Sequence, residues 1–262
     1  MSRYIDTIKN NIRNLEKTSS ALSKRKRQIK KGVYVGKNIK VEPNVFFDTS
    51  GGKIKIGDDT KIKANSILRG PLTIGKKCVI NSFAEISNSK IGDACKIGGE
   101  VEGSTIKSYT NKQHHGFLGH ATVGSWVNLG AGTSVSDLKN TYSTISVKGK
   151  DTGKIFVGPI IGDYVKTAIN TSIFCGKVIG ASSHLYGTVT EDVPAFTSHV
   201  SPGNMYELPL EIAIKIQKAM SARRGVKFTK QDQKKFETLF ARTRGERQKA
   251  GVKIEKLNFK NN

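Results

Sequence analysis

The sequence has no long apolar segment, because no run of hydrophobic residues approaches the roughly 20 that are needed to span a bilayer. Its polar N-terminus also lacks the apolar core of a signal peptide. These two absences predict a cytoplasmic protein without a membrane span. Cysteine is scarce too. The three cysteines, Cys78, Cys95 and Cys175, are odd in number and show no CxxC spacing. This argues against a disulfide framework or a cysteine zinc site and favours small buried side chains.

Aliphatic residues recur at every sixth position over much of the chain. An unbroken run holds Ile56, Ile62, Leu68, Ile74, Ile80 and Ile86; the same spacing occurs at Val35, Val41 and Phe47, at Val123, Leu129 and Val135, and at Ile161, Ile173, Ile179 and Leu185, with Thr167 filling one step. A period of six fits short strands joined by tight turns, with one side chain of each repeat pointing inward. It predicts an all-β solenoid, a left-handed parallel β-helix of hexapeptide repeats, in which stacked coils bury their apolar faces together.

The six-residue pattern is interrupted between Gly98 and Leu118, and again between Val135 and Ile161. Interruptions of a solenoid repeat correspond to loops on one side of the stack, and loops on a rigid scaffold commonly carry functional residues. Three of the five histidines, His114, His115 and His120, lie in the first interruption. We therefore expect the functional site in these two segments.

The net charge of +23 is concentrated at the two ends of the 262-residue chain. Residues 1–32 hold ten Lys/Arg against two acidic residues, and residues 203–262 hold fifteen against six. The length suits one solenoid domain with helical appendages rather than two separate globular cores. The predicted organisation is a basic N-terminal helix at 1–32, the β-helix at 33–202, a C-terminal helical appendage at 203–245, and a basic, partly disordered tail at 246–262.

Both appendages show helical patterns. In the N-terminal one, apolar residues form a narrow seam at Ile5, Ile8, Ile12, Leu15 and Leu22. This seam could pair between subunits or cover the first coil, and the basic run that follows could bind phosphates or be a solvated helix end. In the C-terminal one, a helix is predicted from Pro209 to Gly225, with the stripe Ile212, Ile216, Ala219 and Met220. A second helix is predicted to begin with a Thr229–Asp232 capping box and to bury Phe236, Leu239 and Phe240.

The interrupted region carries a family resemblance. Its motifs are Gly98-Gly99-Glu100-Val101-Glu102, Asn111-Lys112-Gln113-His114, Gly116-Phe117-Leu118-Gly119-His120, Trp126-Val127-Asn128-Leu129-Gly130-Ala131-Gly132-Thr133 and Ser136-Asp137-Leu138-Lys139-Asn140-Thr141-Tyr142. They resemble the acyltransferase half of sugar-phosphate nucleotidyltransferase-like proteins, relatives of the bacterial bifunctional N-acetylglucosamine-1-phosphate uridyltransferase/glucosamine-1-phosphate acetyltransferase. The likeness continues through Phe156–Asp163 and Lys166–Asn170.

The resemblance implies a homotrimeric β-helix that binds acetyl-CoA between subunits and acetylates the amine of an amino-sugar phosphate. The family's catalytic histidine falls on His114, whose neutral imidazole would act as general base. The expected substrate-binding residues are Asn128 and the loop residues Lys139, Asn140 and Tyr142, and the expected coenzyme contact is Ala131. Lys166 and Lys177 are further candidates for the phosphates of coenzyme A, where a lysine supplies a mobile point charge.

Some positions depart from the family pattern. The bifunctional relatives have a Tyr at the position of Phe117, a substrate-binding Lys at that of Glu102, and an Asn-Tyr pair at that of Asp137-Leu138. These differences leave the acceptor open, and Arg69 is a candidate to replace a lost phosphate contact. The nucleotidyltransferase domain of the relatives does not fit into the first 32 residues, so nucleotidyl transfer by these 262 residues alone is excluded.

Three alternatives stay open beside the acetyltransferase interpretation. The first is a non-catalytic β-helix scaffold whose basic ends bind nucleic acid or an acidic partner, although the ends lack interleaved aromatic residues and any nucleic-acid motif. The second is an acyltransferase subunit that docks onto a separate nucleotidyltransferase. The third is zinc binding, for which His115 and His120 could supply two ligands. No third ligand is evident, so we predict no metal site.

Overall fold

The computed structural model describes residues 27–255 and 257 of the chain. Two compact units, residues 1–114 and 115–262, are described separately below as unit 1 and unit 2. The predicted seam helix, with Ile5 to Leu22, and the basic residues 24–26 lie outside the described part. None of the helices in that part has the length and apolar character needed to cross a bilayer.

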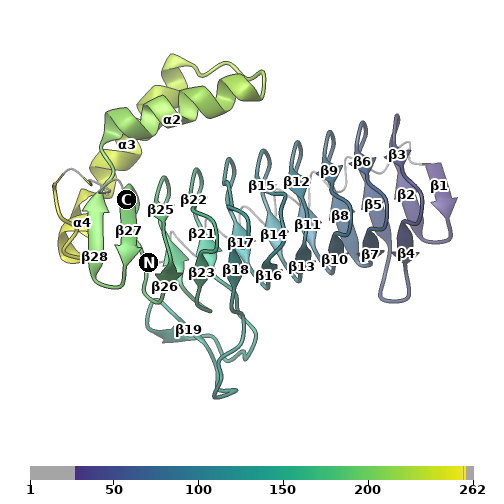
Figure 1. Cartoon of the computed structure of the whole chain (residues 1–262), viewed down its shortest axis with the longest axis horizontal. Helices are drawn as coiled ribbons and strands as arrows, with labels where there is room; N and C mark the ends of the chain where they lie inside the picture. Colours follow the sequence, from purple (N-terminus) through teal and green to yellow (C-terminus); the bar gives the residue numbers. More distant parts are fainter. Residues whose placement is uncertain (1–26, 256, 258–262) are drawn as a thin grey trace. The chain divides into compact units, whose positions relative to one another are not determined.

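Unit 1 is a stack of coils in which each complete coil contributes one short strand to each of three sheets (Figure 1). The first sheet has the order β1 (Arg27–Lys30), β2 (Val33–Val35), β5 (Ile54–Ile56), β8 (Leu72–Ile74), β11 (Lys90–Ile91) and β14 (Thr105–Ile106). The second has β3 (Lys40–Val41), β6 (Lys61–Ile62), β9 (Val79–Ile80), β12 (Lys96–Ile97) and β15 (Asn111–Lys112). The third has β4 (Phe46–Asp48), β7 (Ile67–Arg69), β10 (Glu85–Ser87) and β13 (Glu100–Glu102). Apart from β1, neighbouring strands are parallel, which confirms the predicted parallel β-helix.

The residues of the six-residue pattern form the core of unit 1. Ile56, Ile62, Leu68, Ile74, Ile80 and Ile86 are all 0% exposed. They stack on their equivalents in the next coil, as in the pairing of Ile62 with Ile80 and of Leu68 with Ile86. Val41 is an exception at 41% exposed, because β3 is an outer strand that pairs with β6 on one side. The pattern therefore identifies the core except at the end of the stack.

The first predicted interruption, from Gly98 to Leu118, is not an interruption of the coil. Val101, Ile106 and Lys112 occupy inward positions of β13, β14 and β15, and Lys112 pairs with Ile97 of the coil before it. The six-residue pattern is lost because Val101 follows Ile97 after four residues and Ile106 follows after five more, and because the next inward residue is Lys112 and not an aliphatic residue. The prediction of a loop here is therefore wrong, and His114 directly follows a strand.

The coils of unit 1 differ in length without losing register. Lys40 pairs with Lys61, 21 residues on, whereas Lys96 pairs with Asn111, 15 residues on. Much of the difference lies at one corner, since five residues separate β4 from β5 but two separate β7 from β8. The corner turns absorb the change, so the inward residues stay stacked.

The start of the described chain is a strand and not a helix, which corrects the prediction for residues 27–32. β1 runs antiparallel to β2 and is exposed along its whole length. The outer edge of β2 offers unpaired backbone N–H and C=O groups, and the turn at Gly32, with φ of 80°, brings the preceding residues onto that edge. Tertiary pairing thus overrides the local helical pattern.

The turns of unit 1 repeatedly place a residue other than glycine in the left-handed region. Asn44 and Asn65 occupy equivalent turns with φ of 58° and 61°, and the Asn44 amide donates to the Asn65 side-chain oxygen at 3.2 Å. Phe83 occupies the equivalent turn of the next coil with φ of 61° and is 75% exposed. A bulky residue is costly there, whereas asparagine tolerates the conformation.

We expect Phe83→Asn to raise the free energy of unfolding by about 0.5–1 kcal/mol, because it relieves part of the left-handed backbone cost and extends the asparagine ladder. Urea unfolding measures the change. The matched variant Asn65→Ala should lower stability instead, since alanine fits this backbone conformation poorly and cannot join the ladder. A destabilised Phe83→Asn protein would show that the exposed ring makes a contact that outweighs the strain.

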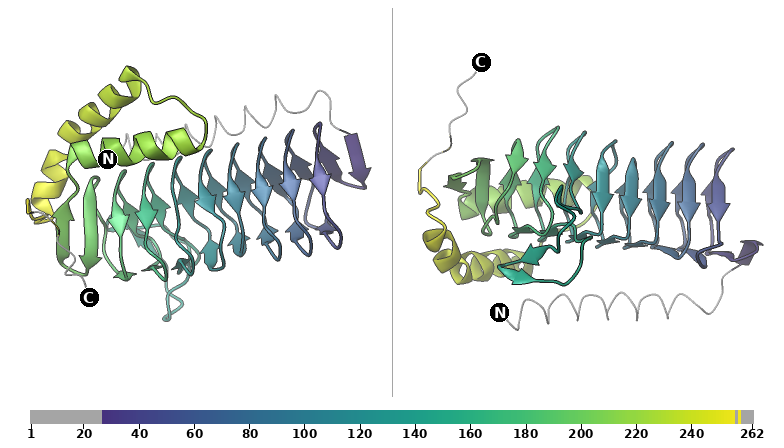
Figure 2. Two further views of the ribbon diagram at one scale, coloured as in Figure 1. Left: turned by 45° about the horizontal axis from the view of Figure 1, so that its top comes forward. Right: turned by 90° about the horizontal axis from the view of Figure 1, so that it is seen from below.

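Unit 2 continues with short parallel strands. Its sheets are β17 (Thr122–Val123), β21 (Ile160–Ile161) and β24 (Val178–Ile179); β18 (Ser134–Val135), β23 (Ser172–Ile173) and β26 (Thr188–Val189); and β22 (Lys166–Thr167), β25 (His184–Leu185), β27 (Thr197–Ser201) and β28 (Asn204–Glu207); β16 (Phe117–Gly119) begins the unit. The predicted inward residues are buried here too, from Val123 at 0% to Thr167 at 7% exposed. Between β18 and β21 the chain makes an excursion containing the antiparallel hairpin of β19 (Ser146–Val147) and β20 (Lys150–Asp151), which projects from the strands of this unit (Figures 1 and 2). The second predicted interruption is therefore a true loop.

The C-terminal part of unit 2 contains α2 (Leu210–Arg223), α3 (Lys230–Arg242) and α4 (Arg244–Lys249). Thr229 caps α3 through the predicted capping box with Asp232. Phe236 is 2% exposed and packs against Tyr164 at a ring distance of 4.6 Å. The predicted face of α2 is wrong: Ala213, Ile214, Gln217 and Ser221 are buried, whereas Ile212 is 41% exposed. The buried residues and the predicted stripe both have helical spacing. The buried face is the one whose Ala213 and Ile214 pack with Ala195, Phe196 and Leu208.

The domain limits of the structure differ from those expected at the C-terminal end. The limit between 202 and 203 falls inside the antiparallel pair β27–β28, and the limit at 245 falls inside α4. Arg247, assigned to the tail, is 2% exposed, and β28 also meets the chain beyond α4 through the bridge from Tyr206 to Lys253. The first part of the expected tail is therefore packed structure. The three cysteines are buried and free, as predicted.

Candidate functional site

The predicted base, His114, is exposed at the end of unit 1, directly after β15. Its Nε2 lies 3.3 Å from the Gln113 side-chain nitrogen, so the amide donates to Nε2 when Nδ1 carries the ring proton. Its backbone carbonyl accepts a hydrogen bond of 3.2 Å from the Lys112 amine. The strand and the lysine thus fix the backbone of His114 while the ring stays accessible to solvent.

Lys112 is a buried cation in the core of unit 1. The side chain is 2% exposed, and Nζ donates to the Gly98 carbonyl at 2.7 Å as well as to that of His114. Burial lowers the pKa of Lys112 to about 8, and the charge of Glu100 offsets part of this effect. Carbonyl oxygens satisfy the amine without neutralising it, so the charged form is held at a cost.

This burial predicts a rise of stability with pH. Folded Lys112 releases its proton near pH 8, whereas an unfolded lysine keeps it to about pH 10.4, so the unfolded state binds more protons in between and the unfolding free energy increases with pH. A shift of this size corresponds to about 3 kcal/mol. In urea unfolding, Lys112→Met should remove the contribution of Lys112 to the increase in unfolding free energy between pH 8 and 10. The exposed Lys40→Met should not alter the pH dependence, and an unchanged slope in Lys112→Met would contradict the prediction.

In unit 2, the excursion between β18 and β21 closes at a narrow neck. The Val157 N–H donates to the Asp137 carbonyl at 2.8 Å, and the Gly158 N–H donates to the His120 carbonyl at 3.1 Å. Asp137 and Val157, twenty residues apart, therefore lie side by side, and His120 lies beside the same neck. These two hydrogen bonds fix the positions at which the loop leaves and rejoins the strands of unit 2.

A histidine and an aspartate meet at this neck. His120 Nδ1 lies 2.7 Å from Asp137 Oδ2, and the Asp137 residue is 9% exposed. The Phe156 ring lies beside the imidazole, with centroids 5.4 Å apart and planes 30° apart. Phe117 belongs to the same cluster, because a β-carbon at Gly119 would collide with both Asp137 Oδ2 and the Phe117 ring. This pair could not be predicted from the sequence, since nothing in the local pattern joins residues 120 and 137.

The predicted substrate residues of the loop follow Asp137. Lys139 donates from Nζ to the Thr144 carbonyl at 2.6 Å, which closes the first turn of the loop. Asn140 is exposed and Tyr142 is 72% exposed with φ of 55°. Two of the three side chains are thus presented to solvent, and the third also has a structural role.

The predicted residues Asn128 and Ala131 lie on the coil that precedes the loop. Both are half-buried, and both have paired backbones: Asn128 bridges to Lys166, and the Ala131 carbonyl accepts from the Asn170 N–H at 2.7 Å. Beneath them, Thr133 and Thr167 join their hydroxyls inside the coil at 2.6 Å. The polar pair explains why threonine can replace an aliphatic residue at position 167.

The two lysines predicted to meet coenzyme A differ in placement. Lys166 directs its amine to the Tyr164 carbonyl at 3.0 Å, and burial lowers its pKa to about 8. It pairs with His184, whose pKa is lowered to about 4 by burial and then by the charge of Lys166. Leu208, Ala213 and Ile216 pack around both, so this lysine is poorly placed to contact a coenzyme phosphate. Lys177 is half-buried on the chain before β24.

Arg69, the last predicted residue, belongs to unit 1 and is engaged by carboxylates. It forms an ion pair with Glu85 of β10 and lies 4.0 Å from Asp48 of β4, one on each neighbouring coil. These contacts give it a structural role that the sequence did not reveal. In the part of the chain that the structure describes, no group of three or more His, Cys, Asp or Glu side chains could hold a metal ion.

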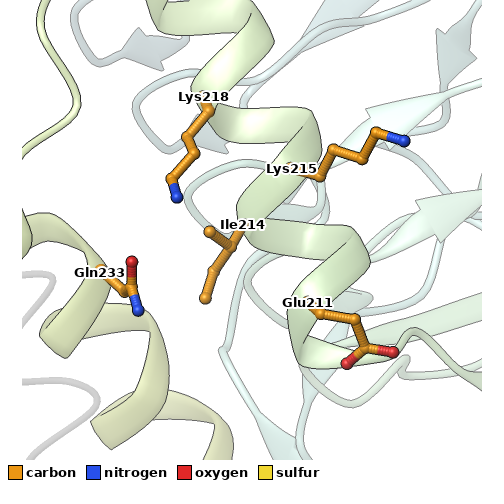
Figure 3. A pocket seen from close by; sticks show the side chains of 5 residues that line it. All are labelled: Glu211, Ile214, Lys215, Lys218 and Gln233. Carbon is orange, nitrogen blue, oxygen red and sulfur yellow. The ribbon is translucent and has the colours of Figure 1, made fainter.

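A separate shallow pocket of about 390 Å³ lies between α2 and α3 and is lined by Glu211, Ile214, Lys215, Lys218 and Gln233 (Figure 3). Lys218 points toward α3, and Lys215 points away from it. None of the predicted site residues lines this pocket.

The chain shares a repeat and part of its sequence with known proteins. The model of the bacterial transferase hexapeptide (six repeats) matches residues 53–88. The bifunctional protein GlmU of Nostoc sp. is 32% identical over 162 residues, covering 61% of this chain and 29% of the relative. GlmU of Synechococcus elongatus is 32% identical over 165 residues, covering 61% and 32%. The chain thus spans about 30% of the length of these relatives.

Solved structures give weaker similarities. UDP-N-acetylglucosamine acyltransferase of Francisella novicida has a TM-score of 0.46 and 14% identity, covering 87% of this chain and 94% of that one. AntD, an N-acyltransferase from Bacillus cereus solved with dTDP and 3-hydroxybutyryl-CoA, has a TM-score of 0.30 and 16% identity, covering 73% and 89%. The repeat model and the sequence relatives confirm the predicted resemblance: residues 53–88 match the hexapeptide repeat, and about three fifths of the chain is similar to GlmU.

Proposed function

We propose that the protein is an acetyl-CoA-dependent N-acetyltransferase that acts on an amino-sugar phosphate. The observation that carries the proposal is the exposed His114, which stands at the motif position of the family's general base and is held by β15 and Lys112. The relation to GlmU supports an acyl-transfer reaction of this kind. The proposed assembly is a homotrimer.

The proposed reaction needs no covalent enzyme intermediate. The neutral imidazole of His114 removes a proton from the sugar amine as the nitrogen attacks the thioester carbonyl carbon. The carbon–sulfur bond then breaks, and the coenzyme leaves as a thiol after it takes up a proton. Asn140 and Tyr142 are exposed on the loop and available to the acceptor, and Lys139 would supply positive charge for its phosphate.

Release of free thiol from acetyl-CoA, with glucosamine-1-phosphate as acceptor, tests this function. Turnover that depends on the acceptor is the expected result, and calorimetry should show binding of coenzyme A to the same preparation. A protein that neither binds coenzyme A nor releases thiol would contradict the proposal. Co-purification would separately test the proposed docking onto a nucleotidyltransferase.

A second candidate function, polyanion binding, is favoured by the surface of the C-terminal helices. Exposed cations occur on all three, at Lys215, Lys218, Arg223, Lys230, Lys234, Lys235, Arg242, Arg244 and Lys249. Such a surface would bind nucleic acid or an acidic protein in a strongly salt-dependent manner. Binding that falls steeply with salt and does not change in a His114 variant would support this second function.

A further inference from the structure

The neck of the loop in unit 2 contains an acid–base pair that the proposed function does not use. We propose that His120, held by Asp137, is a second general base, which removes the proton from an acceptor hydroxyl, whereas His114 serves the acceptor amine. This inference rests on the proposed acyl-transfer function and adds a catalytic residue to it.

The first observation is the hydrogen bond between the two side chains. An ionised carboxylate can only accept, so the 2.7 Å contact places the ring proton on Nδ1 of His120 and leaves Nε2 with a free electron pair. The carboxylate also stabilises the positive charge that the imidazole acquires when it takes up a proton. The pair therefore has the arrangement that a general base requires.

The second observation is the fixed orientation of the pair. Asp137 is 9% exposed, whereas the His120 side chain is 32% exposed, so the carboxylate is shielded while the imidazole remains accessible. Phe156 covers the imidazole at a centroid distance of 5.4 Å, and backbone hydrogen bonds from Val157 and Gly158 hold both residues at the neck. A base with a fixed ring needs little reorganisation to react.

The third observation is the location. Asp137 begins the loop that carries Lys139, Asn140 and Tyr142, and Phe117 packs beside Gly119 against the same carboxylate. Phe117 and Asp137 are two of the positions at which this chain departs from the bifunctional relatives. The missing tyrosine hydroxyl and the gained carboxylate thus lie in one cluster, together with an imidazole.

In the proposed step, Nε2 of His120 takes the proton from a hydroxyl of the acceptor while the oxygen forms a bond to the carbonyl carbon of acetyl-CoA. The carbon–sulfur bond breaks, and the resulting thiolate takes the proton from the imidazolium. The products are the acetylated acceptor and coenzyme A, and the histidine returns to its neutral form. Asp137 is a positioning residue, since it acts through the ring.

Thiol release from acetyl-CoA tests the proposal with two acceptors, glucosamine-1-phosphate and glucose-1-phosphate, which offer an amine and only hydroxyls respectively. The variants are His120→Asn and Asp137→Asn, with His115→Asn as the control for loss of an exposed histidine. Asparagine suits position 120, where φ is 45°, and thermal unfolding checks that each variant is folded. We expect His120→Asn to lower kcat/KM about 10²–10⁴-fold with glucose-1-phosphate, as for other lost general bases, and to leave the rate with glucosamine-1-phosphate near that of the native protein.

Asp137→Asn should lower kcat/KM about 10- to 10³-fold and shift the pH–rate profile, which a residue with a purely structural role would not do. His115→Asn should stay near the native rate. If the native protein turns over glucosamine-1-phosphate but either fails with glucose-1-phosphate or keeps its native rate with it in the His120 and Asp137 variants, the dyad proposal is overturned and the proposed function stands. If the folded native protein binds coenzyme A but releases no thiol with either acceptor, both are overturned.

Discussion

Replacing His114 by asparagine is expected to lower the acceptor-dependent release of thiol from acetyl-CoA by about 10²–10⁴-fold, the usual loss for a missing general base. The substitution keeps a polar side chain of similar size, and the backbone of residue 114 should stay in place because its carbonyl contact comes from Lys112. A loss confined to kcat would indicate an interaction made in the transition state.

Two neighbouring variants make this result specific. Gln113→Ala removes the amide near Nε2 and should change the rate by less than about tenfold, because the amide must give way when a substrate amine approaches. His115→Asn should leave the rate near that of the native protein. A His114→Asn protein that is folded, binds coenzyme A and turns over at the native rate would remove His114 from the mechanism.

The second large effect concerns Arg247. Arg247→Ala is expected to lower the free energy of unfolding by about 3–5 kcal/mol, because it removes a buried guanidinium with all its hydrogen bonds and leaves the partly buried Glu207 carboxylate without its partner. Arg247 is 2% exposed, and Nε donates to Glu207 Oε2 at 2.7 Å. Its other nitrogens donate to the Thr243 hydroxyl at 2.8 Å and to the Phe240 carbonyl at 3.1 Å, and its guanidinium lies 4.1 Å from the Phe240 ring centroid.

The matched control lies on the same short helix. Arg244 is exposed, so Arg244→Ala should change stability by no more than about 0.5 kcal/mol. Arg247→Lys keeps the charge but not the planar fork of donors, and should recover part of the loss. Urea unfolding, together with hydrogen exchange of the β28 amides, measures these effects. Equal stability of the Arg247→Ala and native proteins would show that α4 is not held by this side chain.

The core of the solenoid could be predicted from sequence because burial at each inward position follows from the type of the residue at that position alone. Ile62, Leu68 and Ile74 are aliphatic at a fixed spacing, and burial of such residues needs no distant partner. The spacing is lost after Ile97, because the next inward residues follow after four and five residues and the third is Lys112, whose burial depends on the carbonyls of Gly98 and His114. The regular strands of this segment were therefore predicted to be a loop.

The features that could not be predicted depend on partners far away in the sequence. Arg247 is buried through Glu207, 40 residues earlier, and β1 is a strand because β2 offers an open edge. His120 and Asp137 meet because the loop between Asp137 and Val157 closes on itself. The family motifs led to the predictions for His114 and the loop, whereas no motif joins residues 120 and 137.

The unequal coils of unit 1 have a consequence for how such a chain can change. Lys40 pairs with Lys61 and Lys96 pairs with Asn111, although the two coils differ in length by six residues. The stacking of the inward residues is therefore independent of the length of the corner turns. A short peptide tag placed between β4 and β5 would therefore lengthen one turn and leave the stacking of its neighbours unaltered. The core can be extended only by complete coils, whereas a corner turn can be lengthened by one residue at a time.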